Sequence, residues 1–249
     1  MARVLLVAGL VELLGLAGTA GSARAQPSIS VPAASKPPVT TYIAPQVLFK
    51  ASPLPDWPQG GADADVDLQA VLAAQALRTP ADVKEALLDA TRSPLAWAQD
   101  SAGLGVTFTE QRYPVTTALL LALHEDMRAV NLAANVEKGH RPRPAVIDAR
   151  VKSIFVASLN NTASYPSART ASSSVWALLL GDVFTHRRAA LLAHADRTAQ
   201  LRLIGGAHFP SDLHAGKQVG DAYYAQVLMN PSFQQAMVLA RKEATAAKL

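Results

Sequence analysis

The segment that decides the fold is Arg202-Leu-Ile-Gly-Gly-Ala-His208-Phe-Pro-Ser-Asp212. An alanine-rich helical pattern precedes it and stops at the two glycines, which permit a tight turn. Pro210 suits the first position of a new helix. We therefore expect His208 in a turn between two helices, with Asp212 in the first turn of the second helix.

The same segment combines a cation, an imidazole and a carboxylate. Arg202 offers a planar set of donors for an oxyanion or a phosphate. Asp212, four residues after His208, can hold one ring nitrogen and leave the other free as a nucleophile or a base. A His-x-x-x-Asp pair is more often structural, so one alternative is a fully hydrogen-bonded structural histidine. The arginine and the glycine pair make the catalytic interpretation more specific.

Two earlier segments extend the pattern. Lys138-Gly-His-Arg-Pro-Arg-Pro144 comes first, and Ala163-Ser-Tyr-Pro-Ser-Ala-Arg-Thr170 forms a turn into a helical stretch at residues 171–180. In order, the three segments resemble the three-part signature of the class A non-specific acid phosphatases. That family belongs to the type 2 phosphatidic acid phosphatase and vanadium haloperoxidase superfamily. Its pattern is Lys-x6-Arg-Pro, Pro-Ser-Gly-His and Ser-Arg-x5-His-x3-Asp, and the resemblance covers nearly the whole mature chain.

The resemblance assigns a role to each matching residue. His208 matches the nucleophile that forms a phosphohistidine, and Asp212 matches the carboxylate that orients it. Arg143 and Arg202 match the phosphate-binding arginines. Ser167 matches a serine whose hydroxyl, with backbone N–H groups at a helix N-terminus, holds a phosphate oxygen. Arg143 as a solvated loop residue and Ser167 as a simple helix cap are the alternatives.

Two departures from the family pattern lie in the second segment. Ala168 and Arg169 stand where the family has glycine and histidine, and we place both in the phosphate-binding site. The family's histidine protonates the leaving alcohol. Arg169 keeps its proton at any ordinary pH and is a poor acid, although it can bind phosphate. His140 and His214 are candidate replacement acids without support from their positions.

Two further departures concern the flanking segments. Leu201 replaces the serine before Arg202. The family's lysine should stand at Val136, seven residues before Arg143. Lys138 lies five before and is our candidate substitute in the phosphate-binding site, provided that the helix has already ended near Gly139.

Composition predicts an all-α, single-domain helical bundle, as the resemblance also implies. Half of the 249 residues are hydrophobic and 17% are charged, with alanine and leucine dominant. The net charge is only +4 and no basic stripe is interleaved with aromatic residues, which argues against nucleic acid as a partner. The absence of cysteine excludes disulfides and thiol catalysis.

Residues 1–25 have the pattern of a secretory signal peptide, with Arg3, an apolar run and a cleavage site at Ala23-Arg-Ala25. We therefore expect a periplasmic or secreted protein; an uncleaved anchor is the alternative. Residues 26–61 are proline-rich and predict an extended arm or linker, either packed or disordered. Residues 62–249 form the helical domain, whose apolar runs are too short for stable membrane insertion after cleavage.

Helical periodicity and breakers predict the elements of this domain. Leu119, Leu120, Leu121, Leu123, Met127 and Val130 are core candidates of the longest helix, and Val66, Leu68, Val71, Leu72 and Leu77 those of the first. His124, Glu125 and Asp126 resemble a metal cluster, but a polar helix face explains them equally well. The expected helices are residues 65–77, 80–91, 95–100, 114–137, 145–159, 171–184, 187–203, 210–228 and 231–246.

The resemblance implies a phosphatase that hydrolyses small-molecule phosphate monoesters through a phosphohistidine. We expect reduced activity, because Arg169 replaces the leaving-group acid. The resemblance implies no metal or other cofactor, since arginines neutralise the phosphate charge, and it suggests a homo-oligomer. One alternative is a catalytically silent descendant that binds phosphate or another oxyanion. Another is a vanadate-dependent haloperoxidase, which uses a similar oxyanion site.

Overall fold

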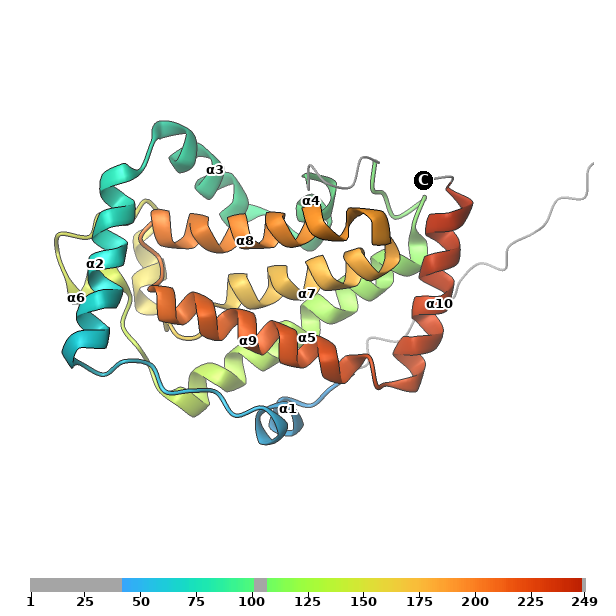
Figure 1. Cartoon of the computed structure of the whole chain (residues 1–249), viewed down its shortest axis with the longest axis horizontal. Helices are drawn as coiled ribbons and strands as arrows, with labels where there is room; N and C mark the ends of the chain where they lie inside the picture. Colours follow the sequence, from blue (N-terminus) through green and yellow to red (C-terminus); the bar gives the residue numbers. More distant parts are fainter. Residues whose placement is uncertain (1–41, 101–106, 248–249) are drawn as a thin grey trace, which may run out of the picture. The chain divides into compact units, whose positions relative to one another are not determined.

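The computed structural model describes residues 42–100 and 107–247, and all regular structure within these ranges is helical (Figure 1). The all-α prediction is confirmed. The described residues fall within one compact unit, Ala34–Leu249. The predicted signal peptide and residues 26–41 of the predicted arm lie outside them. The elements are α1 Pro45–Ala51, α2 Gly61–Leu77, α3 Pro80–Thr91, α4 Pro94–Asp100, α5 Pro114–Lys138, α6 Pro144–Ile147, η1 Ala157–Asn161, α7 Ala168–Val183, η2 Thr185–Arg187, α8 Arg188–Ile204, α9 Pro210–Val227 and α10 Pro231–Ala246.

Proline and polar caps fix where helices begin. Thr79 and Asp82 form a reciprocal capping box before α3, and Asn230 accepts backbone hydrogen bonds at the start of α10. Proline occupies the start of α3, α5, α9 and α10, where its missing N–H has no cost. These local signals are why the predicted boundaries of α3 and α10 agree with the structure.

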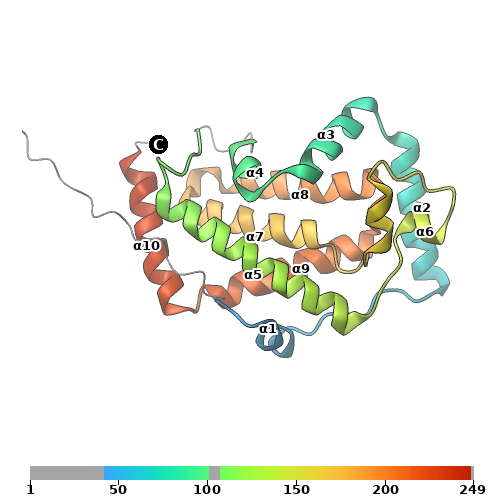
Figure 2. The same cartoon turned by 180° about the vertical axis from the view of Figure 1, so that it is seen from behind.

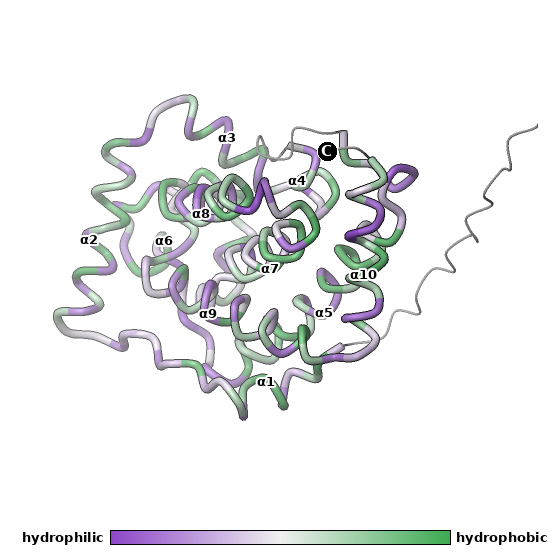
Figure 3. Tube along the Cα trace, turned by 45° about the vertical axis from the view of Figure 1, so that its right-hand side comes forward, coloured by the Kyte–Doolittle hydropathy of each residue, from purple (hydrophilic) through white to green (hydrophobic). Residues whose placement is uncertain are grey.

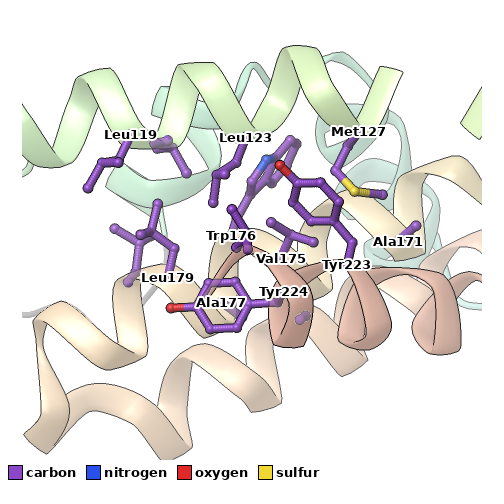
Figure 4. Packing of buried hydrophobic residues seen from close by; sticks show 14 of the residues in the cluster. Leu119, Leu123, Met127, Ala171, Val175, Trp176, Ala177, Leu179, Tyr223 and Tyr224 are labelled. Carbon is purple, nitrogen blue, oxygen red and sulfur yellow. The ribbon is translucent and has the colours of Figure 1, made fainter. Parts of the chain in front are cut away.

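Helix α7 is the centre of the packing. It contacts α5, α8 and α9 along its length, as Figures 1 and 2 show from opposite sides. Twelve of its sixteen residues are buried, so it contacts its neighbours on nearly every face. In Figure 4, Leu119, Leu123 and Met127 of α5 face side chains of α7, with Leu119 above Leu179, and Tyr223 and Tyr224 come from α9. Ser167 caps the N-terminus of this central helix and is therefore buried with it.

Two glycines bring α9 unusually close to α7. A Cβ added at Gly216 would lie 2.5 Å from the Ser167 carbonyl oxygen, and one at Gly220 would lie 2.6 Å from that of Ala171. Neither approach tolerates a larger side chain without a shift of backbone. Close contact lets the Ser167 N–H donate to the Asp212 carbonyl oxygen at 2.9 Å, which ties the second motif to the third.

The helix predicted at residues 145–159 is wrong. Only Pro144–Ile147 is α-helical there, followed by an irregular segment and the short η1. The Asp148 carboxylate accepts from the Arg150 N–H at 2.8 Å, which ends helical continuation. The Ile154 N–H then donates to the carbonyl oxygen of Gly205 at 3.1 Å. A tertiary partner at the glycine pair therefore replaces the local helix.

The core of the longest helix was predicted well, and that of the first helix less so. Leu119, Leu120, Leu123, Met127 and Val130 are all buried, while Leu121 is half-buried. On α2, Val71 is buried, but Val66 and Leu77 are exposed, because that helix covers the end of α8 and α9 with one narrow face. Figure 3 shows alternating hydrophobic and hydrophilic stretches along the helices, as expected of amphipathic elements.

The described part of the proline-rich arm contains a helix that the sequence did not predict, α1. Leu48, Phe49 and Leu54 are buried against the core, and the Tyr42 N–H donates to the buried Asp126 carboxylate at 2.7 Å. Residues 42–54 are therefore packed. Across the described ranges, no helix has an apolar stretch long enough to span a bilayer.

Candidate active site

The three motif segments meet at one cavity of about 300 Å³. Arg143 precedes α6, Ala168 and Arg169 form the first turn of α7, Arg202 lies in the last turn of α8, and His208 lies in the turn before α9. The glycine pair produces that turn, and Gly206 has φ +72°, which favours glycine. Convergence of residues from four parts of the chain is what an oxyanion site requires.

The hydrogen bonds of His208 fix its tautomer. Its Nδ1 lies 2.8 Å from the Ser164 carbonyl oxygen, and its Nε2 lies 2.9 Å from Nη1 of Arg143. A carbonyl only accepts and a guanidinium only donates, so Nδ1 carries the hydrogen and Nε2 carries the lone pair. The nitrogen that could attack a phosphorus atom is therefore the one that shares the cavity with Arg143.

Asp212 forms its short hydrogen bonds with groups around His208 and not with the imidazole ring itself. Its Oδ2 lies 3.5 Å from Nδ1 of His208, but accepts from the Ser164 hydroxyl at 2.5 Å and the Phe209 N–H at 2.8 Å. Its Oδ1 accepts from Nη1 of Arg141 at 2.6 Å. The side chain orders the turn, and the Ser164 carbonyl is the nearer partner of the imidazole.

Burial keeps His208 neutral. Desolvation is the main cause that lowers the pKa of His208 to about 4, and the nearby Arg143 and Arg202 add to it. Asp212 acts in the opposite sense. Burial raises the pKa of Asp212, but its interactions with His208, Arg141 and Ser164 outweigh that effect and hold the pKa below its usual range. At neutral or mildly acid pH the pair is a neutral imidazole beside a carboxylate.

Two arginines supply positive charge at the cavity. Arg143 is fixed by the Ala207 and Ala163 carbonyl oxygens at 2.9 and 2.8 Å. The Arg202 guanidinium lies 4.0 Å from the Phe155 ring centroid, and its Nε has no hydrogen-bond partner in the described part of the chain. Desolvation lowers the pKa of each to about 10, so both stay protonated at neutral pH. Such desolvated, incompletely paired arginines are suited to bind an anion.

Arg169 lines the cavity but is anchored away from it. Its Nη2 and Nε donate to the Asp89 carboxylate at 3.0 and 3.2 Å, and its Nη1 donates to the Arg92 carbonyl oxygen at 3.0 Å. The guanidinium also lies 5.2 Å from the Trp176 ring centroid. Asp89 is fully buried and lies 3.9 Å from Arg202 as well. One buried carboxylate thus balances two of the cavity's arginines.

Ser167 caps α7 rather than lining the cavity. Its hydroxyl oxygen lies 2.9 Å from that of Thr170 and accepts weakly from the Thr170 N–H at 3.4 Å. The side chain is fully buried. The structure places Ser167 beside the cavity, whose lining takes Ala163, Pro166, Ala168 and Arg169 from this segment.

Lys138 lies outside the cavity. Helix α5 runs through Lys138 and ends at Gly139, and the ammonium group pairs with Asp56 at 3.0 Å. Val136, at the family's lysine position, is exposed. His140 is exposed and His214 borders a different cavity. None of these four residues therefore lines the cavity in which a phosphate is expected to bind.

Sequence reasoning missed residues that hold or line the site, namely Asp67, Asp89, Asn135, Arg141, Thr162 and Ser164. Asn135 is the most telling, because it lines the cavity and its Oδ1 is buried without a hydrogen-bond partner among the described residues. A signal existed: Asn131 and Asn135 are polar residues one helical turn apart on the inner face of α5. The others lie outside the family motif positions.

The residues suspected as a metal cluster have separate partners. His124 packs on Trp176, Glu125 pairs with Arg128, and Asp126 accepts from the Tyr223 hydroxyl at 2.6 Å. Within residues 42–100 and 107–247, no group of three potential ligands could hold a metal ion.

Comparison with known proteins finds relatives that are named non-specific acid phosphatases. The chain is 36% identical over 85 residues to a non-specific acid phosphatase of Salmonella typhi, a match covering 34% of each chain. It is 29% identical over 145 residues to that of Providencia stuartii, covering 57% of this chain and 58% of the relative. The match thus spans about a third to somewhat over half of the relatives' length. No family model matches.

The chain is therefore homologous to non-specific acid phosphatases over part of its length. At this modest identity and partial coverage, the relatives support a phosphatase-type enzyme and specify no substrate.

Proposed function

We propose that the protein is a secreted or periplasmic phosphatase that hydrolyses small phosphate monoesters through a phosphohistidine at His208. The observation that carries the proposal is the buried, neutral His208, whose Nε2 lone pair faces a cavity bordered by Arg143, Arg169 and Arg202. Phosphoryl transfer needs a nucleophile in line and positive charge around the equatorial oxygens. The Nε2 lone pair of His208 and the three arginines of the cavity support this proposal.

In the proposed reaction, the substrate phosphate takes the place of His208 Nε2 as the acceptor for Arg143. Nε2 then forms a bond to phosphorus, and the ester P–O bond breaks with its electrons leaving on the departing oxygen. Water next attacks phosphorus, the P–N bond breaks, and inorganic phosphate and neutral His208 result. The Ser164 carbonyl holds Nδ1–H through both steps, because its partner distance is the shortest on that nitrogen.

The proposed cavity lacks a group suited to protonate the leaving oxygen. Its described lining contains no carboxyl, and its only imidazole is His208 itself. Arg169 is held by Asp89 and keeps its proton. We therefore propose low activity on poor leaving groups. The same observation favours a second candidate, a catalytically silent protein that binds phosphate or another oxyanion.

One assay separates the two candidates. The purified protein is incubated with p-nitrophenyl phosphate from pH 4 to 7 without added metal. The enzyme hypothesis expects turnover that His208→Ala abolishes, and a phosphohistidine detectable after acid-free quenching. Asp212→Asn is expected to leave residual turnover, since the Ser164 carbonyl still holds Nδ1–H. No turnover, together with phosphate or vanadate binding that Arg202→Ala weakens, would instead establish the silent binder.

A further inference from the structure

A buried arginine that does not line the cavity is bound to the carboxylate behind the nucleophile. Arg141 is 2% exposed and lies in the loop between α5 and α6, two residues before Arg143. Its Nη1 donates to Oδ1 of Asp212 at 2.6 Å and to the Ser211 hydroxyl at 2.7 Å. Its Nη2 donates to Oδ2 of Asp67, on α2, at 2.8 Å. The proposed reaction, as derived above, gives this side chain no part.

The contacts of Asp212 are divided unequally between its two oxygens. Oδ2 accepts from the Ser164 hydroxyl and from the Phe209 N–H, whereas Arg141 is the one side chain within the described ranges that donates to Oδ1. Asp212 has no exposed surface. Without Arg141, Oδ1 would be a buried anionic oxygen with no donor, and such an oxygen either takes up a proton or moves.

Arg141 also contacts Ser164 through its backbone carbonyl. The Ser164 N–H donates to the Arg141 carbonyl oxygen at 2.9 Å, while the Ser164 hydroxyl donates to the carboxylate that Arg141 holds. The carbonyl of the same serine accepts from Nδ1 of His208. A continuous chain of contacts therefore runs from Arg141 through Asp212 and Ser164 to the nucleophile.

Other contacts fix the guanidinium from outside. It lies 4.1 Å from the ring centroid of Phe209 and 5.4 Å from that of Trp57. Asp67 accepts from the Ser211 N–H at 3.1 Å, so it holds both Arg141 and the first turn of α9. A planar group that lies against two aromatic rings and donates through both terminal nitrogens has little freedom, which is what positioning within a fraction of an ångström requires.

We propose that Arg141 is a positioning residue for the phosphatase reaction, which holds Asp212 and Ser164 so that His208 presents Nε2 to the phosphate. This inference rests on the proposed phosphohistidine function. Arg141 acts through Asp212 and does not touch the substrate. It follows that its removal affects kcat and the acid limb of the pH profile, whereas the KM of the substrate changes little.

The expected direction of the pH effect follows from the groups around Asp212. Arg141 and His208 face it directly, and Arg143 and Tyr165 are close enough to interact with its charge. Loss of the Arg141 charge makes protonation of Asp212 easier, so the acid limb of kcat moves to higher pH. Arg143 remains in place, and the Tyr165 hydroxyl does not replace the lost donor, because it already donates to the Pro55 carbonyl oxygen.

The test compares Arg141→Met with Arg141→Lys, using p-nitrophenyl phosphate. Arg141→Met is expected to lower kcat on the order of 10²-fold, as small misplacements of reacting groups do, and to raise the pH of the acid limb. Arg141→Lys should recover part of kcat and part of the shift in the acid limb, since an ammonium group can still reach Oδ1 of Asp212. In the Asp212→Asn background, Arg141→Met should add little, because the two residues act in one chain.

Asp67→Asn is the matched variant for a purely structural role. It removes a buried partner of Arg141 but leaves the bond between Arg141 and Asp212, so we expect a smaller loss of kcat than in Arg141→Met and no shift of the acid limb. Equal kcat losses in Asp67→Asn and Arg141→Met, an unchanged acid limb, or effects that multiply with Asp212→Asn would overturn the proposal. If Arg141→Met does not fold, Arg141→Lys and Asp67→Asn decide by the same criteria. Turnover that survives His208→Ala would sink the proposed function itself.

Discussion

At the scale of single residues, the site combines a neutral imidazole, the proposed nucleophile, with cations that stay charged at neutral pH. His208 stays neutral because it is buried, and Arg143 and Arg202 stay charged despite burial because their pKa starts far above neutrality. The same desolvation therefore prepares two opposite charge states. What this cavity lacks is a group between those extremes that could give a proton to a departing oxygen.

Arg169 provides the first prediction. Without protonation, an alkoxide is a far worse leaving group than a nitrophenolate, so the wild type should strongly prefer aryl over alkyl phosphates. General acid catalysis typically contributes about 10²–10⁴-fold. Arg169→His should raise kcat/KM for an alkyl phosphate more than for an aryl phosphate, in the range where the new imidazole is protonated. The measurement is the alkyl-to-aryl ratio of kcat/KM before and after substitution.

The control for that prediction uses Asp89, the buried ion-pair partner of Arg169. Arg169→His leaves Asp89 buried with Thr198 and the more distant Arg202. Asp89→Asn combined with Arg169→His removes the unpaired charge, and should keep the changed ratio while restoring stability. Asp89→Asn alone should leave the ratio as in the wild type. Equal wild-type rates on both substrate types would show that another residue already supplies the proton.

Residues that line the cavity could be predicted from the sequence, and the residues that hold them in place could not. His208, Arg143, Arg202 and Arg169 occupy fixed spacings, and the structure brings them to one cavity. Asp89 and Arg141 act through partners 80 and 71 residues away. No local spacing encodes such pairs. Lys138 was misplaced for a related reason, since its ion pair with Asp56 depends on how the arm packs.

At the scale of helices, the boundaries follow from local chemistry and the exception follows from a tertiary contact. Caps and prolines gave α3 and α10 correctly. The stretch at residues 145–159 has helical composition, but its backbone pairs with Gly205 instead. Amino-acid propensities are small compared with such contacts. The close approach of α9 to α7 is likewise invisible until the partner helix is known.

That close approach provides the second prediction. Gly216→Ala forces a Cβ against the Ser167 carbonyl oxygen, which must shift with the N-terminus of α7. We expect a loss of roughly 1–3 kcal/mol in unfolding free energy, typical of overpacking, and a clear loss of kcat, because the Ser167 N–H is bonded to Asp212. Urea denaturation and p-nitrophenyl phosphate turnover measure the two effects.

Gly220→Ala is the matched control, since it creates the same kind of clash one turn further along α9. Its Cβ would meet the Ala171 carbonyl oxygen at 2.6 Å and the Ser174 side chain at 3.0 Å, neither of which borders the cavity. The cost in stability should be similar and the loss of kcat smaller. If both variants lose kcat equally, the glycine contact serves packing in general and has no special link to the site.

At the scale of the whole molecule, one buried and two half-buried histidines couple folding to pH. Desolvation is the leading cause that lowers the pKa of His208, His124 and His194 in the folded protein. The unfolded chain takes up these protons near pH 6.5, the ordinary histidine value. Folded protein takes them up only at lower pH. Asp126 has a raised pKa because of burial, and it contributes in the opposite sense, mainly nearer the ordinary carboxyl range.

The third prediction concerns stability in acid. For a group whose folded pKa lies below its unfolded pKa, acidification favours the unfolded state throughout the window between them. For His208, with a folded pKa of about 4, the loss by pH 5 is roughly 2 kcal/mol, and His124 and His194 add losses of the same sign. The unfolding free energy should therefore fall from pH 7 to pH 5, as measured by urea denaturation.

Substitution assigns that loss to its sources. His124→Phe and His194→Phe should each flatten the pH dependence between pH 7 and pH 5, and so should His208→Asn. The exposed His186 is the control, and His186→Gln should leave the slope unchanged. An unfolding free energy that stays constant or rises on acidification to pH 5 would contradict the argument. If the slope is as expected, the burial that keeps the proposed nucleophile His208 unprotonated in mild acid is also what destabilises the folded protein there.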